Sequence, residues 1–376
     1  MSVVSATGRR RWAAVAAGAV LTGAVVTLAP AALTGEQRTE PGPARELLTR
    51  AQASDSVAYT ALASSRGTLG LPDLPRFGAV AALLGGTTRA RVWWVAPSAW
   101  RVDVLSATGE QGTYGTAGGV VTWDYERNAL VRIVGEPGAR LPRADDLLAP
   151  QATRRLLAGV GADDRVDPLP AADVGGRPTF GVRVVPSNPR STIAHADVWV
   201  DAQSALPLRL RIVARGGEDA LVTQLSDVRL GAPRSTVVVP PEPAGAKVDI
   251  EVAPDLAASV DQRSPWLLPD TLAGLGVTRS LLQGTATYGS GLVRFVVLPL
   301  PHREAHQVMD NARSAGAAPV DVVGGTAVSI SSSLLNAVVA QDADFRHAYL
   351  IAGLVDPELL GLAAGELFAD PPPRRF

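Results

Sequence analysis

The dominant pattern in this chain is a series of short segments in which apolar and polar residues alternate. Each segment is bounded by Gly, Pro, Ser or Asn. Alternation with period two between such boundaries is typical of antiparallel strands that have one solvated face. We therefore predict antiparallel meanders, with strands over 57–62, 88–95, 100–104, 120–125, 130–133, 181–185, 196–200, 208–213 and 221–230.

Three segments have helical patterns instead. Residues 44–53 place Leu47, Leu48 and Ala51 on one face at helical spacing. Residues 145–157 interrupt the strand series with a short helical region, and a further short helix is predicted over 76–84. This last segment is apolar and lies between the first two strands, so it could cover an opening in the sheet.

A second, smaller unit follows a proline-rich connector at 237–243. A last helix begins with Asp356 as N-cap and Pro357 at its first position. The other predicted elements of this unit are strands at 284–288, 292–298, 320–323, 327–330 and 345–352 and a helix at 303–314. The predicted organisation is 1–33 signal sequence or N-terminal membrane anchor, 34–44 linker, 45–245 first domain, 246–368 second domain and 369–376 disordered tail.

The N-terminus has the order of a segment directed into or across a membrane. A basic cluster at 9–11 precedes an uncharged run from Trp12 to Leu33. The run is about 22 residues long, near the ~20 that span hydrocarbon, and 29–31 offers an A-x-A cleavage site. Both anchoring and cleavage stay open. We expect the rest of the chain at the extracytoplasmic face of a bacterial cytoplasmic membrane, anchored or secreted.

Composition excludes several function classes. The chain has no cysteine, so it has no disulfide, no thiolate metal site, no thiol nucleophile and no lipidated cysteine anchor. Its net charge is −1, which gives no electrostatic reason to expect nucleic acid as a partner.

Several segments resemble one protein superfamily. Residues 91–103 (RVWWVAPSAWRVD) look like the second and third strands of the LolA/LolB superfamily, and 121–125 (VTWDY) is similar to its strand with a Trp-x-Tyr pair. Residues 196–209, with ADVWVD followed by LPLR, resemble the hairpin of periplasmic sigma-factor regulators of the RseB/MucB type. Trp266-Leu-Leu-Pro and Tyr288-Gly-Ser-Gly-Leu are similar to that family's small C-terminal domain.

The resemblance implies an α+β fold: a large antiparallel half-open β-barrel (LolA-like) wrapping helices, plus a smaller α/β C-terminal domain. It also implies an apolar cavity for an acyl chain or lipoprotein, and a membrane-bound anti-sigma factor as partner. The sequence departs from typical relatives in its long uncharged N-terminal run and its lack of a lipidation cysteine. The Arg- and Ala-rich composition also suggests a bacterium without the outer-membrane lipoprotein route. Both facts favour sensing or regulation at one membrane over carrier duty between two membranes.

Aromatic residues on the predicted strands are the candidate cavity lining. Trp93 and Trp94 are adjacent, so they point to opposite faces of a strand, whereas Trp123 and Tyr125 share one face. Aromatic pairs on one strand face usually belong to a core, so only the family fold favours a cavity. With that fold in view, we predict Trp94, Trp123, Tyr125 and Trp199 as the ligand-cavity residues.

No catalytic constellation is recognisable. His302 and His306 are spaced to share a helix face, but no third metal ligand accompanies them. The acidic stretch 163–167 lacks the glycine and final glutamate of a calcium loop and is predicted to be a loop with solvated charges. The Gly-rich stretch 112–119 is predicted to be a strand turn, and no G-x-S-x-G motif is present. We therefore predict no enzyme activity, no cofactor and no metal.

These observations favour a non-enzymatic, exported or membrane-anchored sensor or regulator with an apolar lipid-binding cavity, which acts on an anti-sigma factor. The alternative is a lipid or lipoprotein carrier across the cell envelope. An extracytoplasmic hydrolase with an unrecognised site is a third hypothesis.

Overall fold

The computed structural model describes residues 43–68, 83–105, 109–135, 140, 142–242, 244–253, 264, 266–278, 284–314 and 316–374. The predicted N-terminal segment 1–33 and most of the predicted helix 76–84 lie outside these residues. Within the described ranges, we find no helix with the length and apolar character needed to span a bilayer.

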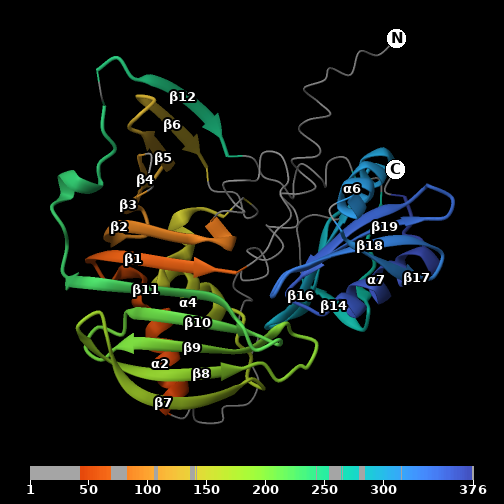
Figure 1. Ribbon diagram of the computed structural model, residues 1–376, viewed down its shortest axis with the longest axis horizontal. Coiled ribbons are helices and arrows are strands. Elements are labelled where there is room, and N and C mark those ends of the chain that lie inside the picture. The colour runs from red at the N-terminus through yellow and green to blue at the C-terminus, as the bar shows by residue number, and fades with distance from the viewer. Residues whose placement is uncertain are drawn as a thin grey trace.

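The first sheet has twelve strands in the order β12-β6-β5-β4-β3-β2-β1-β11-β10-β9-β8-β7 (Figure 1). All neighbours are antiparallel except β12 and β6. The two edge strands, β7 and β12, do not pair with each other, so the sheet is half-open. The strands are β1 (Tyr59–Gly67), β2 (Thr87–Ala96), β3 (Ala99–Leu105), β4 (Glu110–Thr116), β5 (Gly119–Asp124), β6 (Ala129–Val134), β7 (Arg165–Val174), β8 (Arg177–Val185), β9 (Ile193–Asp201), β10 (Pro207–Ala214), β11 (Asp219–Leu230) and β12 (Lys247–Val252).

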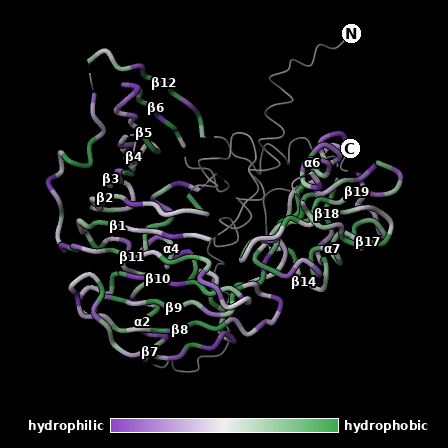
Figure 2. The backbone as a smooth tube through the Cα atoms, viewed as in Figure 1, coloured by the Kyte–Doolittle hydropathy of each residue, from purple (hydrophilic) through white to green (hydrophobic). Residues whose placement is uncertain are grey.

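Alternation gives this sheet two unlike faces. On β1, Tyr59, Ala61 and Ala63 are buried, whereas Leu62 and Arg66 are exposed. We call the buried side the helix face, because two helices cover it, and the opposite side the outer face. Figure 2 shows hydrophobic and hydrophilic residues alternating along these strands, as expected when successive side chains point to opposite sides.

Two helices fill the helix face. α2 (Pro43–Gln52) contributes Leu48 and Ala51, and α4 (Ala149–Leu157) contributes Leu156 and Leu157, to one core cluster with the inward side chains of β8, β9 and β10. A short 3-10 helix, η2 (Ala144–Leu147), leads into α4. The two others are η1 (Ser54–Ser56) and η3 (Ser235–Val238). The predicted fold of an antiparallel half-barrel that wraps helices is confirmed.

The turn between β7 and β8 curls the sheet back onto β11. Gly175 and Gly176 have positive φ angles of 61° and 79°, which side chains other than glycine rarely adopt. A Cβ atom on Gly175 would lie 2.7 Å from the carbonyl oxygen of Leu225, so only glycine permits this approach. Val174 thereby enters the core cluster that also contains Tyr59 and Leu225.

The second, smaller domain is an eight-stranded sheet between two helices, in the order β13-β14-β15-β16-β20-β19-β18-β17. The central strands β16, β19 and β20 are buried on both faces, because α6 (His302–Ser314) packs on one face and α7 (Pro357–Ala369) on the other. The strands are β13 (Thr271–Leu272), β14 (Leu275–Thr278), β15 (Ala286–Ser290), β16 (Val293–Pro299), β17 (Ala318–Val322), β18 (Gly325–Ser331), β19 (Asn336–Asp342) and β20 (Ala348–Gly353).

The start of α7 agrees with the sequence prediction. Pro357 is its first residue, and the carboxylate of Asp356 accepts a hydrogen bond from the Leu359 amide at 2.8 Å. This N-cap satisfies one of the amides that a helix leaves without a partner.

The two domains meet at an ordered junction. Four leucines of the second domain join the core cluster of the first domain; they are Leu292, Leu334, Leu335 and Leu354. Thr192 adds two hydrogen bonds, from its amide to the Leu354 carbonyl (3.1 Å) and from its hydroxyl to the Leu334 carbonyl (2.6 Å). The junction therefore combines apolar packing with backbone pairing.

Several strands lack a sequence signal. β4, which occupies most of the predicted turn 112–119, is polar and glycine-rich, and β7 carries two prolines. β19 was not predicted either, because it is buried on both faces and lacks alternation. β12 pairs in parallel with β6 and so extends the first sheet past the predicted boundary at residue 245.

The C-terminal segment differs from the predicted disordered tail 369–376. The Leu267 amide donates a hydrogen bond to the Pro373 carbonyl at 2.9 Å. The guanidinium of Arg374 lies 5.3 Å from the centre of the Trp266 ring. Residues up to Arg374 are therefore held against the segment before β13.

Substitution of a leucine on the helix face tests this assignment. Leu210, on β10, is 0% exposed in the core cluster, whereas Leu105, on β3, is 37% exposed. We expect Leu210→Ala to lower the free energy of unfolding by about 2–5 kcal/mol through lost burial and a residual cavity. Leu105→Ala is the matched control, with an expected change within about 0.5 kcal/mol. Urea unfolding followed by tryptophan fluorescence measures both, and equal losses would contradict the assigned faces.

Candidate functional site

Trp94 lies on the helix face in an aromatic stack. Its ring lies between those of Tyr59 and Trp100, with centroid distances of 6.4 and 5.8 Å. Its Nε1–H donates to the Asp55 carbonyl at 3.0 Å. Trp94 is only 5% exposed, so the stack is a packed part of the helix face.

The other three predicted aromatic residues lie on the outer face. Trp123 is paired through Gly112 with Asp103, whereas Trp94 is paired with Trp100. Because positions 100 and 103 of β3 point to opposite sides, Trp123 and Trp94 do too, and Tyr125 follows Trp123. Trp199 lies opposite Arg209, next to the inward Leu210, so it also belongs to the outer face.

The structure therefore does not bring the four predicted residues together. Trp123 is buried with Tyr114, Val121 and Leu130, and Tyr125 is 42% exposed, with its hydroxyl accepting a hydrogen bond from Arg101 at 2.8 Å. Three pockets of about 510, 450 and 430 Å³ form among the described residues, and none is lined by any of the four. Their contact with a ligand stays a prediction.

Polar side chains of α4 are the feature of the helix face that the sequence analysis missed. Nη1 of Arg154, both amide atoms of Gln151 and the hydroxyl of Tyr59 are buried without a hydrogen-bond partner. Burial lowers the pKa of Arg154, against the opposing charges of Tyr59 and Asp55, and burial raises that of Tyr59. Unmet buried donors cost free energy. An anionic group with oxygen acceptors would satisfy them.

A sequence signal for this feature exists. Arg154 and Gln151 are three residues apart, so they share one helix face beside the buried Thr153 and Leu157. Two long polar side chains at the border of a buried helix face are the pattern that would have identified them.

A buried carboxylate fixes the start of α4. Asp146 accepts hydrogen bonds from both Nη atoms of Arg140, at 2.7 and 2.8 Å, and from the Arg143 amide at 2.8 Å. Arg155 of α4 pairs with the same carboxylate. Burial alone would raise the pKa of Asp146, but the hydrogen bonds from Arg140 and the charges of Arg155 and Arg143 hold it well below its usual range.

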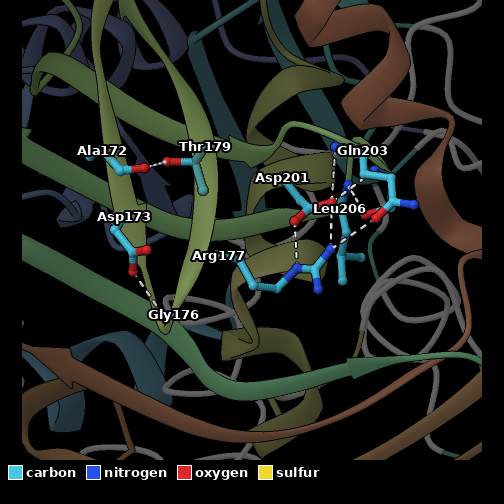
Figure 3. Close-up of polar contacts among 9 residues, drawn as sticks. Ala172, Asp173, Gly176, Arg177, Thr179, Asp201, Gln203 and Leu206 are labelled. Carbon is cyan, nitrogen blue, oxygen red and sulfur yellow. Dashed lines mark hydrogen bonds and ion pairs between the residues drawn. The ribbon is translucent and has the colours of Figure 1, made fainter.

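The hairpin that resembles the RseB/MucB type has a structural explanation. Asp201 accepts hydrogen bonds from the Gln203 and Ser204 amides, at 3.2 and 2.8 Å, and closes the turn between β9 and β10. It also holds Arg177 of β8, whose Nε lies 2.6 Å away (Figure 3). On the outer face the guanidinium of Arg209 lies 4.9 Å from the centre of the Trp199 ring. These residues shape and brace the hairpin.

The acidic stretch 163–167 is not the solvated loop that we predicted. Asp164 is 7% exposed and accepts hydrogen bonds from the amides of Gly161 (2.8 Å) and Ser187 (2.9 Å), and β7 begins at Arg165. The hydrogen bonds from these two backbone amides explain why the carboxylate of Asp164 can be buried. Within the described part of the chain, no group of three His, Asp or Glu residues is arranged to hold a metal ion.

Several solved structures are similar to this chain at low sequence identity. No protein-family model matches the chain, and no curated protein matches it. Among solved structures it is similar to MucB in complex with MucA(peri), at 18% identity, over 86% of this chain and 97% of that chain, with a TM-score of 0.46. It is similar to the MucA/MucB complex of Pseudomonas aeruginosa at 17% identity, over 85% and 96%, with a TM-score of 0.46. A LolA superfamily protein of Nitrosomonas europaea matches at 12% identity, over 52% and 97%, with a TM-score of 0.24.

The chain's own topology, a half-open sheet around helices with a second α/β domain, agrees with the architecture that the sequence resemblance implies.

The Asp146 network predicts a pH dependence. The lowered pKa of Asp146 contributes stability that is fully present above the unfolded-state value of about 3.9 and is lost as pH falls below it. At pH 7, Asp146→Asn removes the buried charge that pairs with Arg140 and Arg155, so we expect a loss of roughly 3–5 kcal/mol in the free energy of unfolding.

The deficit should shrink progressively as pH falls below about 4, because the unfolded state then binds a proton at Asp146 that the folded state, with its lowered pKa, does not bind. Urea titrations at each pH measure it, with Asp163→Asn, an exposed carboxylate of the same region, as control. A deficit independent of pH would contradict the ionised state of Asp146.

Proposed function

We propose that this protein is a non-enzymatic sensor or regulator of the bacterial cell envelope. In this proposal an anionic amphiphile, an acyl chain with an acidic head, binds at the helix face beside α4. Its presence is transmitted to the second domain, which changes the affinity for a protein partner. The main support for this proposal is the position of α4. This helix carries Arg154, whose Nη1 has no hydrogen-bond partner, and its end packs at the domain junction.

The chemistry of the helix face supports an anionic amphiphile. The buried, stacked rings of Tyr59, Trp94 and Trp100 make this part of the helix face apolar. Nη1 of Arg154 and the amide of Gln151 are donors that no described residue accepts from. A guanidinium binds a carboxylate or phosphate through charge-assisted hydrogen bonds. A neutral lipid would leave the charge of Arg154 without a counter-charge, so the site would select ligands by an acidic head group.

The end of α4 supports transmission to the second domain. Leu157 shares its core cluster with Leu292 and Leu335 of the second domain. Two residues on, Gly159 approaches the hairpin between β15 and β16 so closely that a Cβ atom would lie 3.0 Å from the Gly291 carbonyl oxygen. Close-packed contacts of this kind pass on small displacements. A movement of α4 therefore changes the junction.

We propose a membrane-bound anti-sigma factor as the protein partner. MucB has been solved in complex with MucA(peri), and the resemblance of the sequence to RseB/MucB-type regulators motivates the same partner class here. The site of action would be the extracytoplasmic face of the cytoplasmic membrane, reached through the predicted N-terminal segment. A carrier would need the helix face alone, and the contacts between α4 and the junction favour the regulator over that alternative.

Binding of a fluorescent long-chain fatty acid tests the site. We expect Arg154→Gln to weaken binding about tenfold or more, because a charge-assisted contact is lost. Arg50→Gln, which removes an exposed guanidinium from α2, should bind as the wild type does.

Hydrogen exchange reports the transmission. Addition of the fatty acid to the wild type should change the exchange of amides 158–161 and 290–293, and Arg154→Gln should abolish the change. Unchanged affinity in Arg154→Gln would contradict the proposed site, and binding without altered exchange at 290–293 would contradict the proposed regulation.

A further inference from the structure

A pocket on the outer face is lined by three arginines. It lies where the turn between β7 and β8 meets β11, β1 and β2, and it has a volume of about 510 Å³. The residues that line it include Arg91, Arg177 and Arg229, beside Trp93 and Leu62. Neither the candidate aromatic residues nor α4 contributes to it, so it is separate from the helix-face site.

Two irregularities of the backbone create this pocket. The pairing of β1 with β11 shifts register between Thr60 and Leu62, and Asp227 adopts a positive φ of 51° at that bulge. A bulge redirects the side chains that follow it, which here include Arg229. The turn at Gly175 closes the other side through its contact with the β11 backbone.

The three guanidiniums retain free donors. Arg229 makes no hydrogen bond, ion pair or ring contact among the described residues, and Arg91 approaches Glu110 only to 3.8 Å. Arg177 uses Nε and Nη2 for Asp201 and Gln203, which leaves Nη1 (Figure 3). The pocket thus contains several unused N–H groups from three side chains.

The charge balance of the pocket is positive. Its lining contains three guanidiniums and one carboxylate, that of Asp227, which gives 3 − 1 = +2. The carboxylate that orients Arg177 does not compete for a ligand, because the side chain of Asp201 is 0% exposed and also accepts hydrogen bonds from the turn at Ser204. The hydrogen bond with Asp201 raises the pKa of Arg177. A buried acid therefore holds a partly buried cation in place.

We infer that this pocket is a binding site for a phosphate group, either on a lipid head or on a small soluble ester. Guanidinium donors fit the oxygens of phosphate in a planar, bidentate manner, and arginines from three strands line this pocket. The indole of Trp93 and the half-exposed Leu62 offer apolar surface for the group that the phosphate esterifies. This inference is independent of the proposed function, because it uses the opposite face of the sheet.

Titration calorimetry of the full chain with glycerol phosphate tests the site. We expect Arg229→Gln to weaken binding about tenfold or more. The variant should fold as the wild type does, because the Arg229 side chain makes no hydrogen bond or ion pair among the described residues. Arg234→Gln is the matched control, an exposed arginine five positions along the chain, and it should bind as the wild type does.

A second variant tests the sign of the electrostatic effect. Asp227→Asn removes the carboxylate of the pocket, and asparagine tolerates the positive φ. We expect phosphate to bind several-fold more tightly. Equal binding by wild type and Arg229→Gln, or weaker binding by Asp227→Asn, would overturn the inference.

Two further arms distinguish the source of the phosphate. Cosedimentation with phosphatidylcholine vesicles, with and without phosphatidylglycerol, reports a lipid head group when binding requires phosphatidylglycerol and falls in Arg229→Gln. Binding of glycerol phosphate without vesicle binding identifies a soluble ester. Absence of both overturns the site, whereas fatty-acid binding at Arg154 would be unaffected.

Discussion

The placement of α4 against the helix face is the constraint on which the other features depend. α4 is short, so packing and its anchored start hold it in place, since isolated helices of this length are marginal. Asp146, buried under Arg140 and Arg155, supplies that anchor, and Leu156 and Leu157 supply the packing. The same helix then carries Arg154 at the aromatic stack and delivers the chain to the junction. A single well-held helix thus places the candidate site next to the second domain.

Buried aspartates that hold exposed arginines recur across the first domain. Asp103, Asp197 and Asp201 have side chains that are 0–2% exposed, while their arginine partners Arg101, Arg183 and Arg177 are 20–34% exposed. An isolated buried carboxylate would be costly, and hydrogen bonding to a guanidinium offsets that cost. The arrangement hides the negative charge and displays the positive one. Each pair is neutral in sum, and its guanidinium is the more exposed partner.

Period-two alternation predicted the positions of most strands of the first sheet, because one wet face leaves a clear signal. It failed for β4 and β7, whose glycines and prolines mimic turns, and for β19, where burial on both faces removes the alternation. The candidate aromatic residues show a further limit. Alternation relates Trp93 to Trp94 within a strand, but the relation of Trp94 to Trp123 depends on the register of three intervening pairings. Turn geometry sets that register, and alternation within one strand does not reveal it.

The residues that carry the family resemblance and those that offer free binding capacity are different residues. Trp199 contacts Arg209, and Asp201 binds Arg177 and the turn after β9. The motif therefore stabilises the hairpin that shapes the sheet. Arg154 and Arg229 lie outside every segment that resembles the family, and each keeps an unused donor. A structural motif must satisfy its own polar groups, whereas a binding residue must leave some of them for the ligand. Unmet hydrogen-bonding capacity is therefore the better guide to function in this chain. That criterion points to one face of the sheet for an amphiphile and to the other for a phosphate.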